Sequence, residues 1–326
     1  MTSAFVEALG KPTAERWTSV LFGPATLFWA VGLLMWMLGE SSWDQSGQRL
    51  LDWFGRLSSG EQIVVAMGAL LVFTALDAFV RRFSFPALQL LEGYGVLMRV
   101  RPLTRYQAAR LAKANAELDA FLKGPDLSSL PPEELDRYST VAERVRRSPA
   151  SAAFLMPTGL GNILRAAETW PRDKYGLDAV ICWPRLSLLL DDAAKGEIAK
   201  AEQGLDDAVV LFIWGALAFL AWSIVFQDAL VILVTLLIAT SVCTFAYWWA
   251  KQRARIFADL VEATFDVHRG KLYDALRVKK PNKSSDEPQL GEKITGFLWW
   301  RESQKSPELD YVEDESRKAD DSAKTL

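Results

Sequence analysis

The chain has 326 residues, of which 37 are basic and 40 acidic, and a formal net charge of −3. Its mean hydropathy of +0.08 and its 24% charged residues resemble those of a soluble domain, but an average conceals how the apolar residues are placed. A single histidine, His268, and two cysteines distant in sequence, Cys182 and Cys243, argue against a metal site and against a disulfide. We expect no cofactor, no catalytic constellation and no nucleic-acid partner.

Four apolar segments come close to the roughly 20 residues that a helix needs to cross a bilayer. They are residues 17–38, 63–80, 208–226 and 229–250, and the last two are separated by only two residues. The sequence therefore predicts an all-α integral membrane protein. Its four transmembrane helices form a 2+2 arrangement around a helical block at residues 81–207.

Basic residues near a membrane favour the cytoplasmic side. Residues 81–113 contain seven basic residues and one acid, whereas the connection at 39–62 contains four acids and two arginines. We expect residues 1–16, the central block and the segment after 250 to be cytoplasmic, with the chain in the plasma (inner) membrane. The connection at 39–62 is external, and its apolar face predicts a short helix along the membrane interface or a cap on the first two spans.

Asp77 is the one acid inside a predicted span, where an ionisable group is costly and is a candidate for a pore or proton pathway. It also precedes Arg81 by four residues, the spacing of an ion pair on a helix. Ion pairing with Arg81 is the favoured interpretation, and a pore role remains open.

The central block reads as helices packed under the membrane. Residues 107–123 are rich in good helix formers, and the run 131–134 (PPEE) can open the next helix with a proline in its first turn and acids near its positive end. Pro171 and Pro184 are expected to mark turns. The glycines at 159 and 161 stand at a helix start with Asn162 as its N-cap; backbone binding of a phosphate there is the less favoured alternative. Arg165 and Arg185 are candidates for contact with lipid headgroups or for ordinary ion pairs.

Four motifs occur in order along the chain: residues 90–94 (LLEGY), 157–168 (PTGLGNILRAAE), 175–186 (YGLDAVICWPRL) and 265–269 (FDVHR). With these motifs the chain resembles a group of uncharacterised bacterial multi-pass membrane proteins, which implies a four-helix membrane protein and no activity. In architecture alone it is similar to bestrophin-type anion channels. Residues 81–86 (RRFSFP) depart from the aromatic and arginine-rich signature expected there in that family.

The fourth span carries Thr235, Ala239 and Cys243 at four-residue spacing, with Thr240 and Thr244 on an adjoining face. Small residues let membrane helices pack closely, so packing or a subunit interface is favoured over a pore lined by hydroxyls. Helical spacing continues from 251 to about 280. Residues 281–326 are rich in charged and small polar residues and are expected to be mostly disordered, with an apolar island at 294–300 that docks on this protein or a partner.

Two functions fit this reading. The first is an oligomeric pore or channel-like protein made by several copies of the chain. The alternative is a membrane-anchored scaffold or signalling component that recruits a soluble cytoplasmic partner through the block and the tail. A polar stripe on two or more spans would favour the pore.

Overall fold

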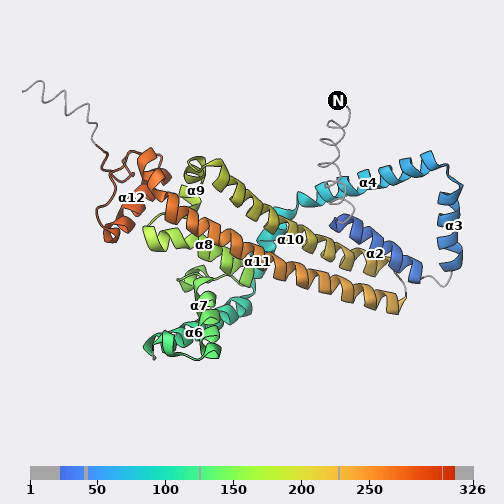
Figure 1. The fold of residues 1–326 in the computed structure, drawn as a ribbon, viewed down its shortest axis with the longest axis horizontal. Coiled ribbons are helices and arrows are strands. Elements are labelled where there is room, and N and C mark those ends of the chain that lie inside the picture. Colours follow the sequence, from blue (N-terminus) through green and yellow to red (C-terminus); the bar gives the residue numbers. More distant parts are fainter. Residues whose placement is uncertain (1–22, 40–42, 125, 227, 303, 313–326) are drawn as a thin grey trace, which may run out of the picture. The chain divides into compact units, whose positions relative to one another are not determined.

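The structure is a computed structural model that describes residues 23–39, 43–124, 126–226, 228–302 and 304–312. Helices make up its regular structure within these ranges (Figure 1), apart from an isolated bridge between Val278 and Tyr311. The chain forms two compact units. One, here the apolar unit, comprises Met1–Gln89 and Gly204–Ala250; the other, the polar unit, comprises Leu90–Gln203 and Lys251–Leu326.

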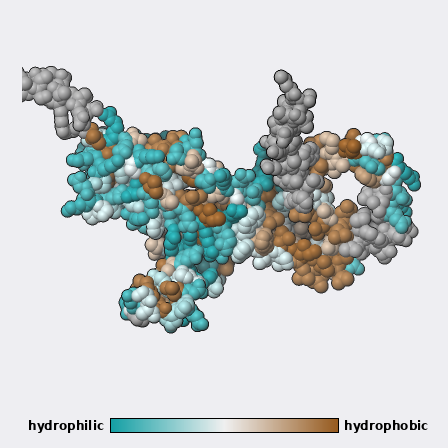
Figure 2. All heavy atoms as spheres, in the orientation of Figure 1, coloured by the Kyte–Doolittle hydropathy of each residue, from teal (hydrophilic) through white to brown (hydrophobic). Residues whose placement is uncertain are grey.

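Three helices are long and apolar enough to cross a membrane: α4 (Ser59–Arg81), α10 (Asp192–Val225) and α11 (Ala229–Ala275). Apolar residues gather on the helices of the apolar unit, whereas hydrophilic residues cover most of the visible face of the polar unit (Figure 2). α2 (Pro24–Gly39) has 16 residues, and residues 17–22 of the expected first span lie outside the described ranges. Three of the four predicted spans therefore have candidate helices, and the first span, at residues 17–38, stays a prediction.

Aromatic rings hold α2 against α10. The ring of Phe28 lies 5.0 Å from that of Trp214 and 5.2 Å from that of Trp222, measured between centroids. A Cβ built on Gly32 would stand 1.9 Å from the Trp222 ring, so any larger residue would force this indole to move from where it crosses the helix. α3 (Trp43–Arg56) occupies the connection for which a short amphipathic helix was predicted, and its Trp53 and Phe54 are exposed.

The polar unit is built from short helices and the outer parts of the two longest ones. After α5 (Ser84–Glu92), α6 and α7 form a helical hairpin, α8 and α9 follow, and α12 packs on both of these. Their bounds are α6 Arg101–Lys123, α7 Pro132–Arg146, α8 Gly159–Tyr175, α9 Ala179–Leu188 and α12 Glu287–Trp299. α7 starts at Pro132, inside the predicted run 131–134, with Glu133 and Glu134 in its first turn. α11 continues past the apolar stretch to Ala275, as its periodicity predicts.

The tail departs from the expectation of disorder, because α12 is a helix whose Ile294 is fully buried. Ile294 joins a core with Phe265, Leu272 and Cys182. The apolar island at 294–300 thus docks on its own chain. Burying one face of a short helix compensates for the polar composition that by itself predicts disorder.

Two local predictions in the polar unit were wrong. Pro171 and Pro184 lie inside α8 and α9 and mark no turns; each helix loses one backbone donor there and is held by tertiary packing. The N-cap of α8 is Thr158, whose hydroxyl accepts the N–H of Gly161 at 3.0 Å. Asn162, predicted as the cap, is buried one turn inside the helix.

Candidate anion-binding pocket

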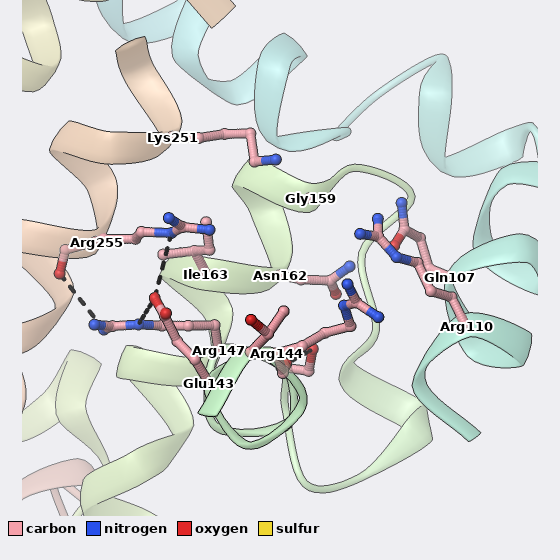
Figure 3. Close-up of a pocket in the computed structure, with 12 residues that line it drawn as sticks. Gln107, Arg110, Glu143, Arg144, Arg147, Gly159, Asn162, Ile163, Lys251 and Arg255 are labelled. Carbon is pink, nitrogen blue, oxygen red and sulfur yellow. Dashed lines mark hydrogen bonds and ion pairs between the residues drawn. The ribbon is translucent and has the colours of Figure 1, made fainter. Parts of the chain in front are cut away.

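A cavity of about 310 Å³ opens in the polar unit between α6, α7, α8 and α11 (Figure 3). Five basic side chains and a single acid, Glu143, line it. The basic residues are Arg110, Arg144, Arg147, Lys251 and Arg255, and the remaining polar lining residues are Gln107, Thr140, Ser148 and Asn162. A cavity of this size accommodates a small molecule, and its lining carries a large excess of positive charge.

Glu143 lies between two of the arginines. Its Oε1 is 4.0 Å from Nε of Arg147 and 3.8 Å from Nε of Arg255, distances that are long for charge-assisted hydrogen bonds. Arg147 is anchored elsewhere, because its Nη2 donates to Asp259 at 2.7 Å and its Nη1 to the Arg255 carbonyl at 3.5 Å. The side chain of Arg147 is only 10% exposed, and its buried Nε has no hydrogen-bond partner among the residues that the structure describes.

Three cations of the pocket have no acidic partner. Among the residues that the structure describes, no carboxylate lies within 4.0 Å of a charged nitrogen of Arg110, Arg144 or Lys251. In Figure 3 the side chains of Arg110 and Arg144 point toward the space beside Asn162, and Lys251 reaches over Gly159. Cations held together without counter-charges repel one another, so an anion bound among them is strongly favoured.

The start of α8 forms one wall. A Cβ on Gly159 would stand 3.7 Å from Nζ of Lys251, which places the ammonium group across the first turn of the helix. The positive end of a helix dipole adds to the attraction for an anion at that point. The glycine at 159 thus lies at the pocket, as the less favoured phosphate interpretation of this motif required.

Buried hydrogen bonds hold this wall in place. The Asn162 amide accepts the backbone N–H of Met156 at 2.8 Å and donates to the Met156 carbonyl at 3.1 Å, which fixes the loop before α8. The Thr158 hydroxyl donates to the Glu92 carbonyl at 2.7 Å. A Cβ on Gly161 would meet that carbonyl at 2.0 Å, so glycine is required for this approach.

An acid near this wall has an unusual pKa. Burial, reinforced by the nearby Glu168 and opposed by Arg165, raises the pKa of Glu92 to about 7. Glu92 precedes the Gly93–Tyr94 turn of the first sequence motif. The backbone carbonyl that anchors α8 therefore belongs to a residue that changes charge near neutral pH.

Asp77 and Arg81, predicted together, are in contact at the end of α4. Nε of Arg81 donates to Asp77 at 2.9 Å, and Nη1 donates to Asp207 at 2.8 Å and to Asp206 at 3.4 Å. The Trp214 indole N–H also donates to Asp77 at 3.1 Å. Asp77 thus belongs to an ion-pair cluster, the interpretation that the four-residue spacing favoured.

The three threonines of the fourth span separate into two groups. Thr235 and Ala239 are buried on one side of α11. Cys243 continues that side, and a Cβ built on Gly215 of α10 would lie 2.9 Å from its Sγ. That face packs on α10. Thr240 and Thr244 are exposed, and the Thr244 hydroxyl donates to the Thr240 carbonyl at 2.8 Å.

Arg165 and Arg185, the two candidates for contact with lipid headgroups, differ in their hydrogen-bond partners. Arg165 forms an ion pair with Glu168 at 2.7 Å and donates to the Tyr94 hydroxyl at 2.8 Å. Arg185 donates to the Ile181 carbonyl in its own helix at 2.8 Å. Contact of Arg185 with lipid stays a prediction.

Sequence reasoning did not assemble the basic pocket, because its residues come from four helices that are far apart in the chain. One signal was available. Residues 93–116 contain five basic residues and no acid, so at least one cation of α6 could not be paired locally. No group of three or more metal-ligating side chains was found among the residues described.

Comparison with models of protein families, with curated proteins and with solved structures found no match to this chain. The resemblances drawn from its motifs and architecture therefore stay predictions, and the proposals below rest on the geometry of the chain itself.

Proposed function

We propose that this protein is a multi-pass membrane protein whose polar unit binds a small anionic ligand bearing a phosphate group. The observation that carries the proposal is the cluster of three cations, Arg110, Arg144 and Lys251, that face one cavity and pair with no acid of the described ranges. The proposal gives the expected membrane-anchored signalling component a ligand. The chain lies in the plasma membrane with both termini and the polar unit on the cytoplasmic side.

Phosphate chemistry suits the lining better than a monoanion. A phosphate ester presents several oxygens and up to two negative charges, and arginine forks bind such oxygens in pairs. Lys251, from α11, adds a positive charge close to the first turn of α8. Arg147 and Arg255 are positioning residues, because Arg147 already pairs with Asp259 at 2.7 Å and Arg255 donates to the Gln252 side chain at 3.0 Å.

The test is binding of inorganic phosphate and of pyrophosphate to the full chain in nanodiscs of phosphatidylcholine, by isothermal titration calorimetry. Each charged hydrogen bond is worth about 1.5–3 kcal/mol, so Arg144→Gln and Lys251→Gln should each weaken binding by about tenfold to a hundredfold. Lys195→Gln, which changes the net charge equally outside the pocket, is the matched control. Equal affinities in the parent and both pocket variants would refute the proposal.

An oligomeric pore is the second candidate. It is favoured by three exposed hydroxyl residues on one side of α11, Thr240, Ser241 and Thr244. The hydroxyls of Ser241 and Thr244 donate to carbonyls of their own helix, and their oxygens can still accept hydrogen bonds along a path or at a contact between copies. Such a pore requires a closed ring of subunits. The mass of the chain in detergent or nanodiscs tests this first, followed by bilayer recordings with Asp77→Asn and Thr240→Val; a monomer or dimer would eliminate the pore between subunits.

A further inference from the structure

The segment at residues 96–106 combines apolar and basic side chains that the described part of the chain leaves exposed. It includes the short 3-10 helix η1 (Leu97–Arg99) and the first turns of α6. The exposed fractions of its large apolar residues are 71% for Val96, 47% for Met98, 37% for Val100, 38% for Leu103 and 63% for Tyr106. Five exposed large apolar side chains within eleven residues of a folded unit indicate an interaction surface.

The same segment carries three exposed arginines, Arg99, Arg101 and Arg105. No carboxylate in the described ranges forms an ion pair with any of them, and the sequence has no acid between Glu92 and Glu117. Apolar side chains interleaved with unpaired cations complement an anionic lipid surface, whose headgroups attract the cations while the acyl boundary accepts the apolar groups.

The chain itself limits where this surface can be. α4, a candidate span, ends at Arg81, and Val96 follows it by fifteen residues, nine of them in the helix α5. At about 1.5 Å per helical residue and about 3.5 Å per extended residue, that linker reaches at most roughly 35 Å. The segment therefore stays within about 35 Å of the end of α4, a reach that allows it to contact the membrane face at which α4 ends.

We infer that the segment at residues 96–106 docks on the anionic headgroup layer of the bilayer in which the chain is anchored. Val96, Met98 and Leu103 enter the boundary between headgroups and acyl chains, and the three arginines contact lipid phosphates. This surface is separate from the pocket, because none of these residues lines it, and each proposal is tested by variants that leave the other site unchanged.

The test uses the full chain in nanodiscs, with a bimane fluorophore on Met98→Cys and, as matched control, on Leu122→Cys near the other end of α6. Both positions are exposed apolar residues of the polar unit. Cys182 is fully buried and burial raises its pKa to about 11, so it labels slowly at neutral pH, and the parent chain measures the background. Quenching by brominated lipid reports insertion, and quenching by iodide reports exposure to water.

In nanodiscs that contain phosphatidylglycerol, the label at 98 should be quenched several-fold more by brominated lipid than the label at 122, and less by iodide. The combined Arg99→Gln, Arg101→Gln and Arg105→Gln variant should lower the ratio of docked to free segment by roughly a hundredfold, since each basic residue near an anionic membrane contributes about 1 kcal/mol. The difference in quenching between the labels at 98 and 122 should also be smaller in discs of phosphatidylcholine alone.

Two results would overturn the inference. Equal iodide quenching at 98 and 122 would place the segment in water, and shielding at 98 from both quenchers would mean that protein, such as a second copy of this chain, covers it. A second experiment tests the same inference without a fluorescent label. Trypsin should cut the unmodified chain after Arg99 and Arg105 more slowly in anionic discs than in phosphatidylcholine discs, and equal cutting rates would also contradict docking.

Discussion

Gly291 of α12 allows this helix to cross the end of α8 at very close range. A Cβ built on it would stand 1.9 Å from the Tyr175 carbonyl oxygen and 2.9 Å from the Gly176 carbonyl carbon. Both obstacles are backbone atoms, so no side-chain rotation relieves the clash. Gly176, with φ at +71°, is the left-handed residue that ends α8, and it has little freedom to move. Gly291→Ala must therefore push α12 away.

The displacement has a cost that can be estimated from the contacts it breaks. The Thr295 hydroxyl donates to the Gly176 carbonyl at 3.2 Å and accepts the Asp178 N–H at 3.0 Å, and each such bond is worth about 1 kcal/mol. Overpacking a close contact adds about 1–3 kcal/mol. Against this, alanine is favoured over glycine inside a helix by about 1 kcal/mol. The expected net loss in free energy of unfolding is about 2–4 kcal/mol.

Gly196 in α10 provides the matched control, because no atom lies within 4 Å of a Cβ built there. Gly196→Ala should stabilise the chain by about 0.5–1 kcal/mol through helix propensity alone. The assay is pulse proteolysis of the full chain in detergent across a urea series, with cleavage near α12 followed by mass spectrometry. If Gly291→Ala were as stable as the parent, or were stabilised like Gly196→Ala, the close crossing of α12 and α8 would be refuted.

Three further predictions concern single groups. Asn162→Ala leaves the N–H and carbonyl of Met156 without their buried partners and should cost about 1–3 kcal/mol of unfolding free energy, measured by urea denaturation. Glu92 has its pKa raised from 4.5 to about 7, so the folded state holds a proton that the unfolded state has released. Stability should therefore fall as pH rises from 4.5 to about 7, and Glu92→Gln should abolish that fall in unfolding curves recorded against pH. Arg81→Gln leaves three carboxylates near one another without their shared cation. For this half-exposed cluster it should lower the free energy of unfolding by about 1–3 kcal/mol, and with it the unfolding temperature. An unchanged midpoint in a thermal scan would contradict this.

The apolar helices could be predicted from the sequence because hydrophobicity along the chain is a local property. Predicted spans at 63–80, 208–226 and 229–250 fall within α4, α10 and α11, apart from a single residue beyond the end of α10. Helix starts with strong local chemistry were also predictable, because α7 begins inside the proline and glutamate run at 131–134. Predictions that depended on contacts were less accurate, and Asn162, read as a cap from its position after two glycines, is a buried anchor for a loop.

The amino-acid sequence by itself determined an all-helical chain with long apolar segments, an ion pair one turn apart on α4 and an acid-free run at 93–116, since each depends on residues near one another in the chain. Only the tertiary structure decided that α12 is ordered and that Arg110, Arg144 and Lys251 face one cavity. The physical reason is that burial and charge pairing depend on which helices meet. The free energy of burying Ile294, or of gathering cations around a cavity, arises only when segments far apart in sequence come into contact.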